Sequence, residues 1–126
     1  EFGCRAALAG SLGVPTVFVS GDDKMIAEAQ ALIPNIRGAQ VKVGLAPQVA
    51  LHLAPEDARD LIRSVAADAT THINEIAPYV IPGPPYVQEV VIWGRTDPTM
   101  YTSRGFQQIG PRTFILQAEL LQDLWI

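Results

Sequence analysis

Acidic side chains and one lysine occupy the positions in this chain where chemistry is usually placed. The segment Thr16–Ser20 is rich in β-branched and aromatic residues, and Gly21, Asp22 and Asp23 follow it directly. Such a segment is typical of a strand that is buried on both faces, and ligands of open α/β sheets gather at the carboxyl ends of these strands. A further carboxylate, Glu1, lies on the preceding helical segment. The acids at the end of the strand therefore lie where ligands usually bind.

A structural interpretation of Asp22 and Asp23 stands beside the functional one. Either residue can cap the helix predicted from Lys24 to Leu32, and an acid in the first turn also complements the helix dipole. In the functional interpretation, Asp22 lies at the rim of a cleft. Gly-Asp-Asp after a strand also occurs in haloacid-dehalogenase-like phosphatases, whose acids hold Mg²⁺, but their Asp-x-Asp-x-Thr motif is absent from this strand.

Lys42 and the two histidines are the remaining candidates. Lys42 lies between Val41 and Val43 in a short predicted strand, so its side chain points to the face opposite the valines. We expect it to be exposed or salt-bridged, or else to face the site. His52 and His72 belong to no His-Glu-x-x-His motif, and structural roles are expected for both. The sequence contains no Gly-x-Ser-x-Gly motif and no glycine-rich phosphate loop.

The elements that must position these residues are of the α/β type. A helix of small residues is expected before Gly13, and a short strand near residues 39–43. Residues 48–53 are apolar and fit either a helix or an extended segment. The clearest helix runs from Pro55 to about Ile76, because proline suits the first helical position and apolar residues then recur at steps of three or four.

The second half of the chain has a different pattern. Proline-rich residues 79–85 cannot form a central strand. Strands are expected at residues 86–93 and 112–117, a short helix with a turn at 96–105, and a last helix at 118–126. The fold class predicted is α/β: the end of a doubly wound, mostly parallel sheet, followed by a small α+β portion. Residues 1–45 would form the first part and residues 46–126 the second.

Composition excludes several classes of function. The 126 residues are 48% hydrophobic, which is sufficient for one domain or part of one. A net charge of −4 without a basic stripe argues against nucleic acid as a partner, and no long apolar run indicates a membrane span. The single cysteine, Cys4, favours a reducing, cytoplasmic compartment and is expected to pack as an apolar group. The chain begins without methionine inside a predicted helix, so we expect a fragment of a longer protein.

Several segments resemble one family, the zinc-dependent D-aminopeptidases associated with dipeptide-transport operons. Glu1, Gly3 and Ala6 match the family pattern Glu-x-Gly-x-Asn-Ala, in which Arg5 here replaces the asparagine. The segment Gly-Val-Pro, followed by a strand that ends in Ser-Gly-Asp, matches at residues 13–22. Val-Lys-x-Gly matches at residues 41–44, and the closing run GFQQIGPRTFILQAELL is also similar. The resemblance covers nearly the whole chain.

The resemblance implies an enzyme and a role for each candidate residue. Glu1 would be a ligand of a site that holds two Zn²⁺ ions, within a metal-binding layer formed in part by residues 1–45, and Asp22 and Lys42 would bind substrate or support the site. An Asp-x-Glu pair and two histidines, the other ligands, and a catalytic histidine would lie in a preceding part of the protein. The whole enzyme would be a cytoplasmic homo-oligomer that hydrolyses N-terminal D-amino acids from short peptides.

Two other interpretations remain open at this point. In one, this half of the protein has no catalytic role and contributes to oligomerisation and to a wall that selects substrate. In the other, the chain is an unrelated α/β ligand-binding domain that shares only the Gly-Asp-Asp corner.

Overall fold

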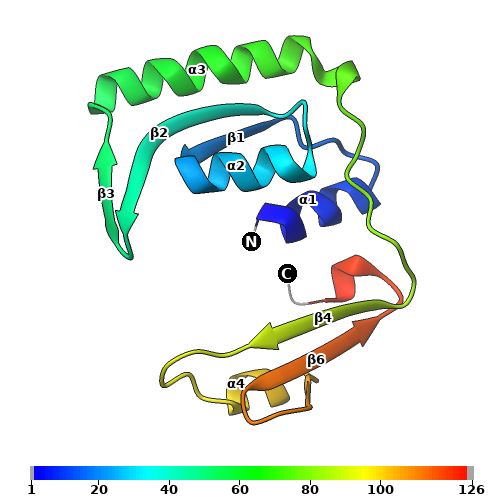
Figure 1. Cartoon of the computed structure of the whole chain (residues 1–126). Helices are drawn as coiled ribbons and strands as arrows, with labels where there is room; N and C mark the ends of the chain where they lie inside the picture. Colours follow the sequence, from blue (N-terminus) through cyan, green and yellow to red (C-terminus); the bar gives the residue numbers. More distant parts are fainter. Residues whose placement is uncertain (1, 125–126) are drawn as a thin grey trace. The chain divides into compact units, whose positions relative to one another are not determined.

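The chain folds into two compact units, residues 1–80 and residues 81–126, in a computed structural model that describes residues 2–124 (Figure 1). Both units combine helices with a small sheet, so the predicted α/β class is confirmed. The boundary predicted after residue 45 concerns a different division, between a metal-binding layer and the rest of the chain, and it stays a prediction. Within residues 2–124, no helix is long and apolar enough to cross a membrane.

The first unit is a three-stranded sheet with helices on both faces. Strands β1 (Phe18–Asp22) and β2 (Arg37–Ala46) are parallel, and β3 (Val49–His52) pairs antiparallel to β2 as a hairpin. Figure 1 shows β1 and β2 between helices α2 (Asp23–Leu32) and α3 (Pro55–Thr71), both of which contact them. The core of this unit consists of buried apolar residues from the strands, from α2 and from flanking segments: Ala6, Val19, Ile26, Ala29, Ile33, Ile36 and Ile76.

Helix α1 (Phe2–Ser11) ends in a glycine cap. Gly13 has a φ of +77°, its N–H donates to the Gly10 carbonyl at 3.0 Å, and the Val14 N–H donates to the Ala9 carbonyl at 2.9 Å. This pair of bonds satisfies helix-end carbonyls only when the capping residue adopts the left-handed conformation, which glycine reaches without steric cost. The chain can therefore turn directly from α1 into the first strand.

The structure of this unit resolves one ambiguity of the sequence and corrects two predictions. Residues 49–52 are a strand and not a helix, because Val43 and Leu51 are directly opposed in the antiparallel ladder and a turn with Gln48 at a φ of 63° joins the strands. Helix α3 ends at Thr71, five residues before the predicted end, and a 3₁₀ turn, η1 (Ile73–Glu75), follows it. Cys4 is exposed, so its predicted packing as an apolar group is wrong.

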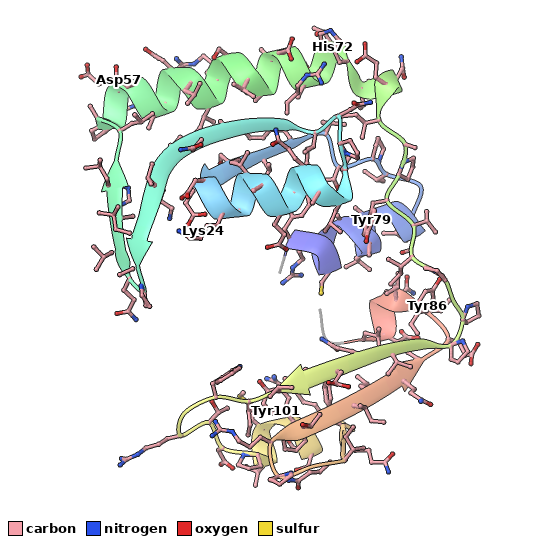
Figure 2. All side chains as sticks on the ribbon, viewed as in Figure 1. Lys24, Asp57, His72, Tyr79, Tyr86 and Tyr101 are labelled. Carbon is pink, nitrogen blue, oxygen red and sulfur yellow. The ribbon has the colours of Figure 1, made fainter. Side chains whose placement is uncertain are left out.

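The second unit is an antiparallel sheet of order β4-β6-β5. Its strands are β4 (Tyr86–Val91), β5 (Gln107–Gln108) and β6 (Thr113–Ala118), with the short helix α4 (Thr99–Thr102) between β4 and β5. Tyr101, labelled in Figure 2, stacks on Phe114 with ring centroids 5.4 Å apart and meets the edge of Phe106 at 5.6 Å. These aromatic rings, together with Ile92, form the core of the unit.

The helix predicted for residues 118–126 is wrong within the part that the structure describes. Residue Ala118 still belongs to β6, and only a single 3₁₀ turn, η2 (Leu121–Asp123), follows. Leu121 and Leu124 are both buried. Since a 3₁₀ turn repeats every three residues, it buries this pair as well as an α-helix would, which is why the apolar spacing suggested a helix.

Candidate functional site

Asp22, Lys42 and His52 line one pocket of about 240 Å³ at the junction of the first sheet with its hairpin. A register shift after Gly21 places Asp22, the last residue of β1, opposite Lys42 of β2, and the antiparallel ladder places Lys42 opposite His52 of β3. The three residues therefore lie side by side on neighbouring strands. The carboxyl end of β1 is where ligands of α/β sheets gather, so this pocket is the candidate functional site.

Asp22 and Asp23 have different partners. Asp22 is the N-cap of α2, and its Oδ1 accepts a hydrogen bond from the Met25 N–H at 2.9 Å. Asp23 reaches instead to the neighbouring strand, where its Oδ1 accepts from the Gly44 N–H at 2.8 Å. Because this hydrogen bond stabilises the charged form, it holds the pKa of the Asp23 carboxyl below its ordinary value, and the adjacent Lys24 ammonium acts in the same direction.

Lys24 completes this connection between α2 and β2. Figure 2 shows it at the start of α2. Its Nζ donates to the Gly44 carbonyl at 2.7 Å and lies 3.8 Å from Asp23 Oδ2. Both polar backbone groups of Gly44 are thus bound by side chains from the start of α2. A Cβ at Gly44 would lie 3.1 Å from Lys24 Nζ and 3.6 Å from Asp22 Oδ2, so glycine leaves space for these groups. The corner formed by residues 22–24 fixes the strand that carries Lys42.

The predicted helix cap is confirmed for Asp22, and the same residue also lines the pocket. Lys42 is half-buried and faces the pocket, and none of residues 2–124 forms an ion pair with it, so the salt-bridged alternative is wrong there. The functional roles of Asp22 and Lys42 stay predictions. Glu1, the predicted metal ligand, lies outside the described residues.

His52 is the pocket residue whose position the sequence reasoning missed. Its position depends on the pairing of β3 with β2, and residues 48–53 were ambiguous between helix and strand. His72, by contrast, lies at the end of α3, where its Nδ1 is 2.8 Å from the Asp68 carbonyl oxygen and 3.3 Å from Asp68 Oδ1. This is the structural role expected for it.

The part of the chain that the structure describes has no group of three histidine, cysteine, aspartate or glutamate side chains placed to hold a metal ion. A structural or catalytic zinc site needs at least three protein ligands. Residues 2–124 therefore do not by themselves fit a zinc ion, and one oxygen of the Asp22 carboxylate accepts the Met25 N–H at the start of α2.

Comparisons with known proteins agree on one family. The model of a family described as D-aminopeptidase matches residues 1–125. A D-aminopeptidase of Bacillus subtilis (strain 168) is 34% identical over 85 residues, which are 68% of this chain and 31% of that protein. A solved structure, described as the Zn-dependent D-aminopeptidase DppA from Bacillus subtilis, a self-compartmentalizing protease, superposes with a TM-score of 0.80 at 25% identity. It covers 98% of this chain, and the match covers 45% of that structure's chain.

The chain thus spans less than half the length of the solved structure and about a third of the curated relative that it matches.

Proposed function

The chain belongs to the D-aminopeptidase family, and on this basis we propose that it is part of a zinc-dependent enzyme that removes N-terminal D-amino acids from short peptides. The family match over residues 1–125 is the observation that carries the proposal. It is supported by the superposition on a structure described as Zn-dependent. Membership of a peptidase family also favours this interpretation over an unrelated ligand-binding domain.

The proposed metal site holds two zinc ions, with Glu1 as one ligand. Carboxylate oxygen is a common zinc ligand, and two-metal sites occur in aminopeptidases. No cluster of three ligands lies among residues 2–124, and in this proposal parts of the complete protein outside this chain supply the other ligands. The contribution of this chain is then the Glu1 carboxylate together with the pocket that Asp22, Lys42 and His52 line.

Asp22 and Lys42 serve the site in different ways in this proposal. Asp22 is fixed by its hydrogen bond to the Met25 N–H and supports the wall of the pocket, whereas Lys42 presents an ammonium group without an ion-pair partner among residues 2–124. Asp22 thus holds the wall of the pocket in place, and Lys42 is available to bind a negatively charged group of a substrate.

The complete protein is further proposed to be a cytoplasmic homo-oligomer. The solved structure to which the chain is similar is described as self-compartmentalizing. An assembly of several subunits is one way in which a peptidase can enclose its own sites, and closed homo-oligomers are the commonest form of such assemblies.

Activity and metal content of the full-length protein test the proposal together. We expect release of D-alanine from D-alanyl peptides, faster than release of L-alanine from L-alanyl peptides, and about two zinc ions per subunit by elemental analysis. Glu1→Ala should lower both the zinc content and kcat/KM, the latter by more than about 100-fold, because a direct ligand should cost at least as much as the outer partners of a metal site.

Arg63→Ala, which removes an exposed side chain on α3, is the matched control and should change neither quantity. Near-normal turnover by Glu1→Ala would show that the ligand assignment is wrong. A wild-type protein that prefers L-alanyl peptides would show that the proposed substrate class is wrong.

A further inference from the structure

The pocket occupies one face of the β2–β3 hairpin, and its floor is made of small residues. Gly44 pairs with Ala50 across the ladder, and Lys42 pairs with His52 one step along the same face. Neighbouring residues of a strand point to opposite faces, so Val43 and Leu51, the pair between these two, lie on the other side of the hairpin. The small side chains leave room between the strands and the corner of Asp22.

Lys42 differs from Lys24, the other lysine, and from Arg37 in having no ion-pair partner within residues 2–124. Lys24 is bound to Gly44 and Asp23, and Arg37 donates to Asp68 at 2.8 Å and lies 3.5 Å from Glu75. Lys42 is half-buried as a residue, and within residues 2–124 its ammonium has neither an ion pair nor a hydrogen-bond acceptor from a side chain. Removing a charge partly from water is unfavourable unless another group compensates it. An anionic group of a ligand in the pocket would provide this compensation.

Asp22, on the opposing strand, does not supply this anion. No ion pair within 4.0 Å joins its carboxylate to Lys42, and one of its oxygens accepts the Met25 N–H. Its negative charge is balanced in part by the positive end of the α2 dipole. The pocket therefore contains the Lys42 ammonium, next to His52, as an unpaired positive charge among residues 2–124. The negative charge of Asp22, on the neighbouring strand, is partly balanced by the start of α2.

We propose that Lys42, together with a ring N–H of His52, binds the C-terminal carboxylate of a short peptide substrate. This inference rests on the proposed function and makes it more specific. A charged hydrogen-bond pair between ammonium and carboxylate is stronger than a neutral one. The pocket of about 240 Å³ has room for a carboxylate beside Lys42, and an adjoining pocket of about 450 Å³ shares Asp22 and Gly44 with it. Because Lys42 would bind a charged terminus, this subsite would favour peptides with a free C-terminal carboxylate over those with a neutral one.

The test compares D-alanyl-D-alanine with its C-terminal amide on the full-length protein loaded with zinc. The two differ only in whether the C-terminus carries a charge. The wild type should have a KM for the free acid at least about tenfold lower than for the amide, because a hydrogen bond to a charged group contributes that much to binding. Lys42→Met should raise the KM for the free acid to near that of the amide, with a smaller change in kcat. Lys42→Arg, which keeps the cation, should retain most of the discrimination.

Arg63→Met is the matched control, because it also removes one positive charge but from the exposed face of α3, where its partner is Asp60. It should leave the ratio of the two KM values at the wild-type value. A wild type that hydrolyses both substrates without discrimination would overturn the carboxylate subsite alone, and this comparison needs no variant to fold. Full discrimination in Lys42→Met would also overturn it. Turnover of neither substrate by the wild type would overturn the proposed function and the subsite together.

Discussion

Asp22 and Asp23 show how two identical neighbouring side chains acquire separate roles. Asp22 has an extended backbone and accepts the Met25 N–H, as an N-cap does, whereas Asp23 is already in the first turn of α2 and reaches Gly44 on the next strand. Only Asp22 lines the candidate pocket. A carboxylate in this position can both begin the helix and serve the site, and a substitution that keeps only the cap can separate these two roles.

Asp22→Ser is that substitution. Serine caps a helix about as well as aspartate, so the free energy of unfolding should change by less than about 0.5 kcal/mol. If the carboxylate supports the site, kcat should fall by about 10-fold or more, as it does when outer partners of a metal site are removed. Chemical denaturation and steady-state kinetics of the full-length protein measure the two effects.

Asp22→Ala is the companion variant, since it removes both the cap and the charge. It should lower the stability by about 1 kcal/mol and lower the activity as Asp22→Ser does. Wild-type activity of Asp22→Ser would show that Asp22 serves only as a helix cap.

The residues of the site were predictable from sequence to different degrees. The Gly-Asp-Asp corner after a buried strand pointed to Asp22, and the alternation of Val41, Lys42 and Val43 pointed Lys42 away from the valines. That these two residues share a pocket depends on the register shift after Gly21, which no residue pattern reports. The place of His52 depends on pairing between strands, which is set by tertiary structure and not by local propensity.

At the scale of elements, helix α1 lies close to the backbone at Tyr79, in the segment that follows the 3₁₀ turn η1. A Cβ at Gly10 would overlap the carbonyl of Tyr79, which is labelled in Figure 2. Gly10 is buried in the last turn of the helix, and the neighbouring Ala6 and Ala7 are also buried. Small residues on this face therefore allow two backbones to approach, and the run of glycine and alanine before Gly13 has a packing reason.

Gly10→Ala should destabilise the protein by about 2 kcal/mol or more, because backbone atoms must move to admit the methyl group and overpacking of this kind is costly. The gain in helix propensity, at most about 1 kcal/mol, offsets only part of this loss. Gly3→Ala is the control on the same helix. Its Cβ would meet only the terminal methyl of Leu32, at 3.0 Å, and a flexible side-chain end can yield.

Urea unfolding of both variants measures the difference. We expect Gly3→Ala to lie within about 1 kcal/mol of the wild type, where the propensity gain and a small steric cost nearly cancel. Equal stabilities for the two variants would contradict the close approach of α1 to Tyr79.

Elements with strong local signals were predicted well, and those that depend on partners were not. Helix α3 begins at Pro55 as expected, because proline and two acids favour that start regardless of tertiary contacts. Its end was predicted too late, since Ile73 and Ile76 continue the apolar spacing through the 3₁₀ turn. The same ambiguity between spacings of three and four produced the wrong helix after Ala118.

At the scale of the whole molecule, the chain presents apolar surface that a complete protein would be expected to cover. The side of the hairpin opposite the pocket carries Val43 and Leu51, which are 38% and 67% exposed, and further exposed apolar residues lie on or beside the same strands: Leu45, Val49 and Leu53. Contiguous exposed apolar residues on one element mark interaction surfaces more often than single ones do. The chain spans less than half of the solved structure to which it is similar, and in the proposed enzyme parts outside this chain or other copies of it would cover this face.

Sedimentation of the full-length protein tests the proposed assembly. We expect a homo-oligomer at micromolar concentration, because apolar burial between copies stabilises association in proportion to the area removed from water. Leu51→Lys places a charge on the exposed side of the hairpin without altering the pocket face, and Arg63→Lys on α3 is a control that keeps the charge of its site.

A lower mass or weaker association for Leu51→Lys alone would assign the hairpin to the contact between subunits. An unchanged oligomer with a lowered melting temperature would instead assign it to burial within one subunit. A wild-type protein that sediments as a monomer would contradict the assembly itself, whichever surface covers the hairpin. Trp125, in the apolar run that ends the sequence, is also expected to be buried in the assembly, because a terminal tryptophan is costly to leave in water; it lies outside the described residues.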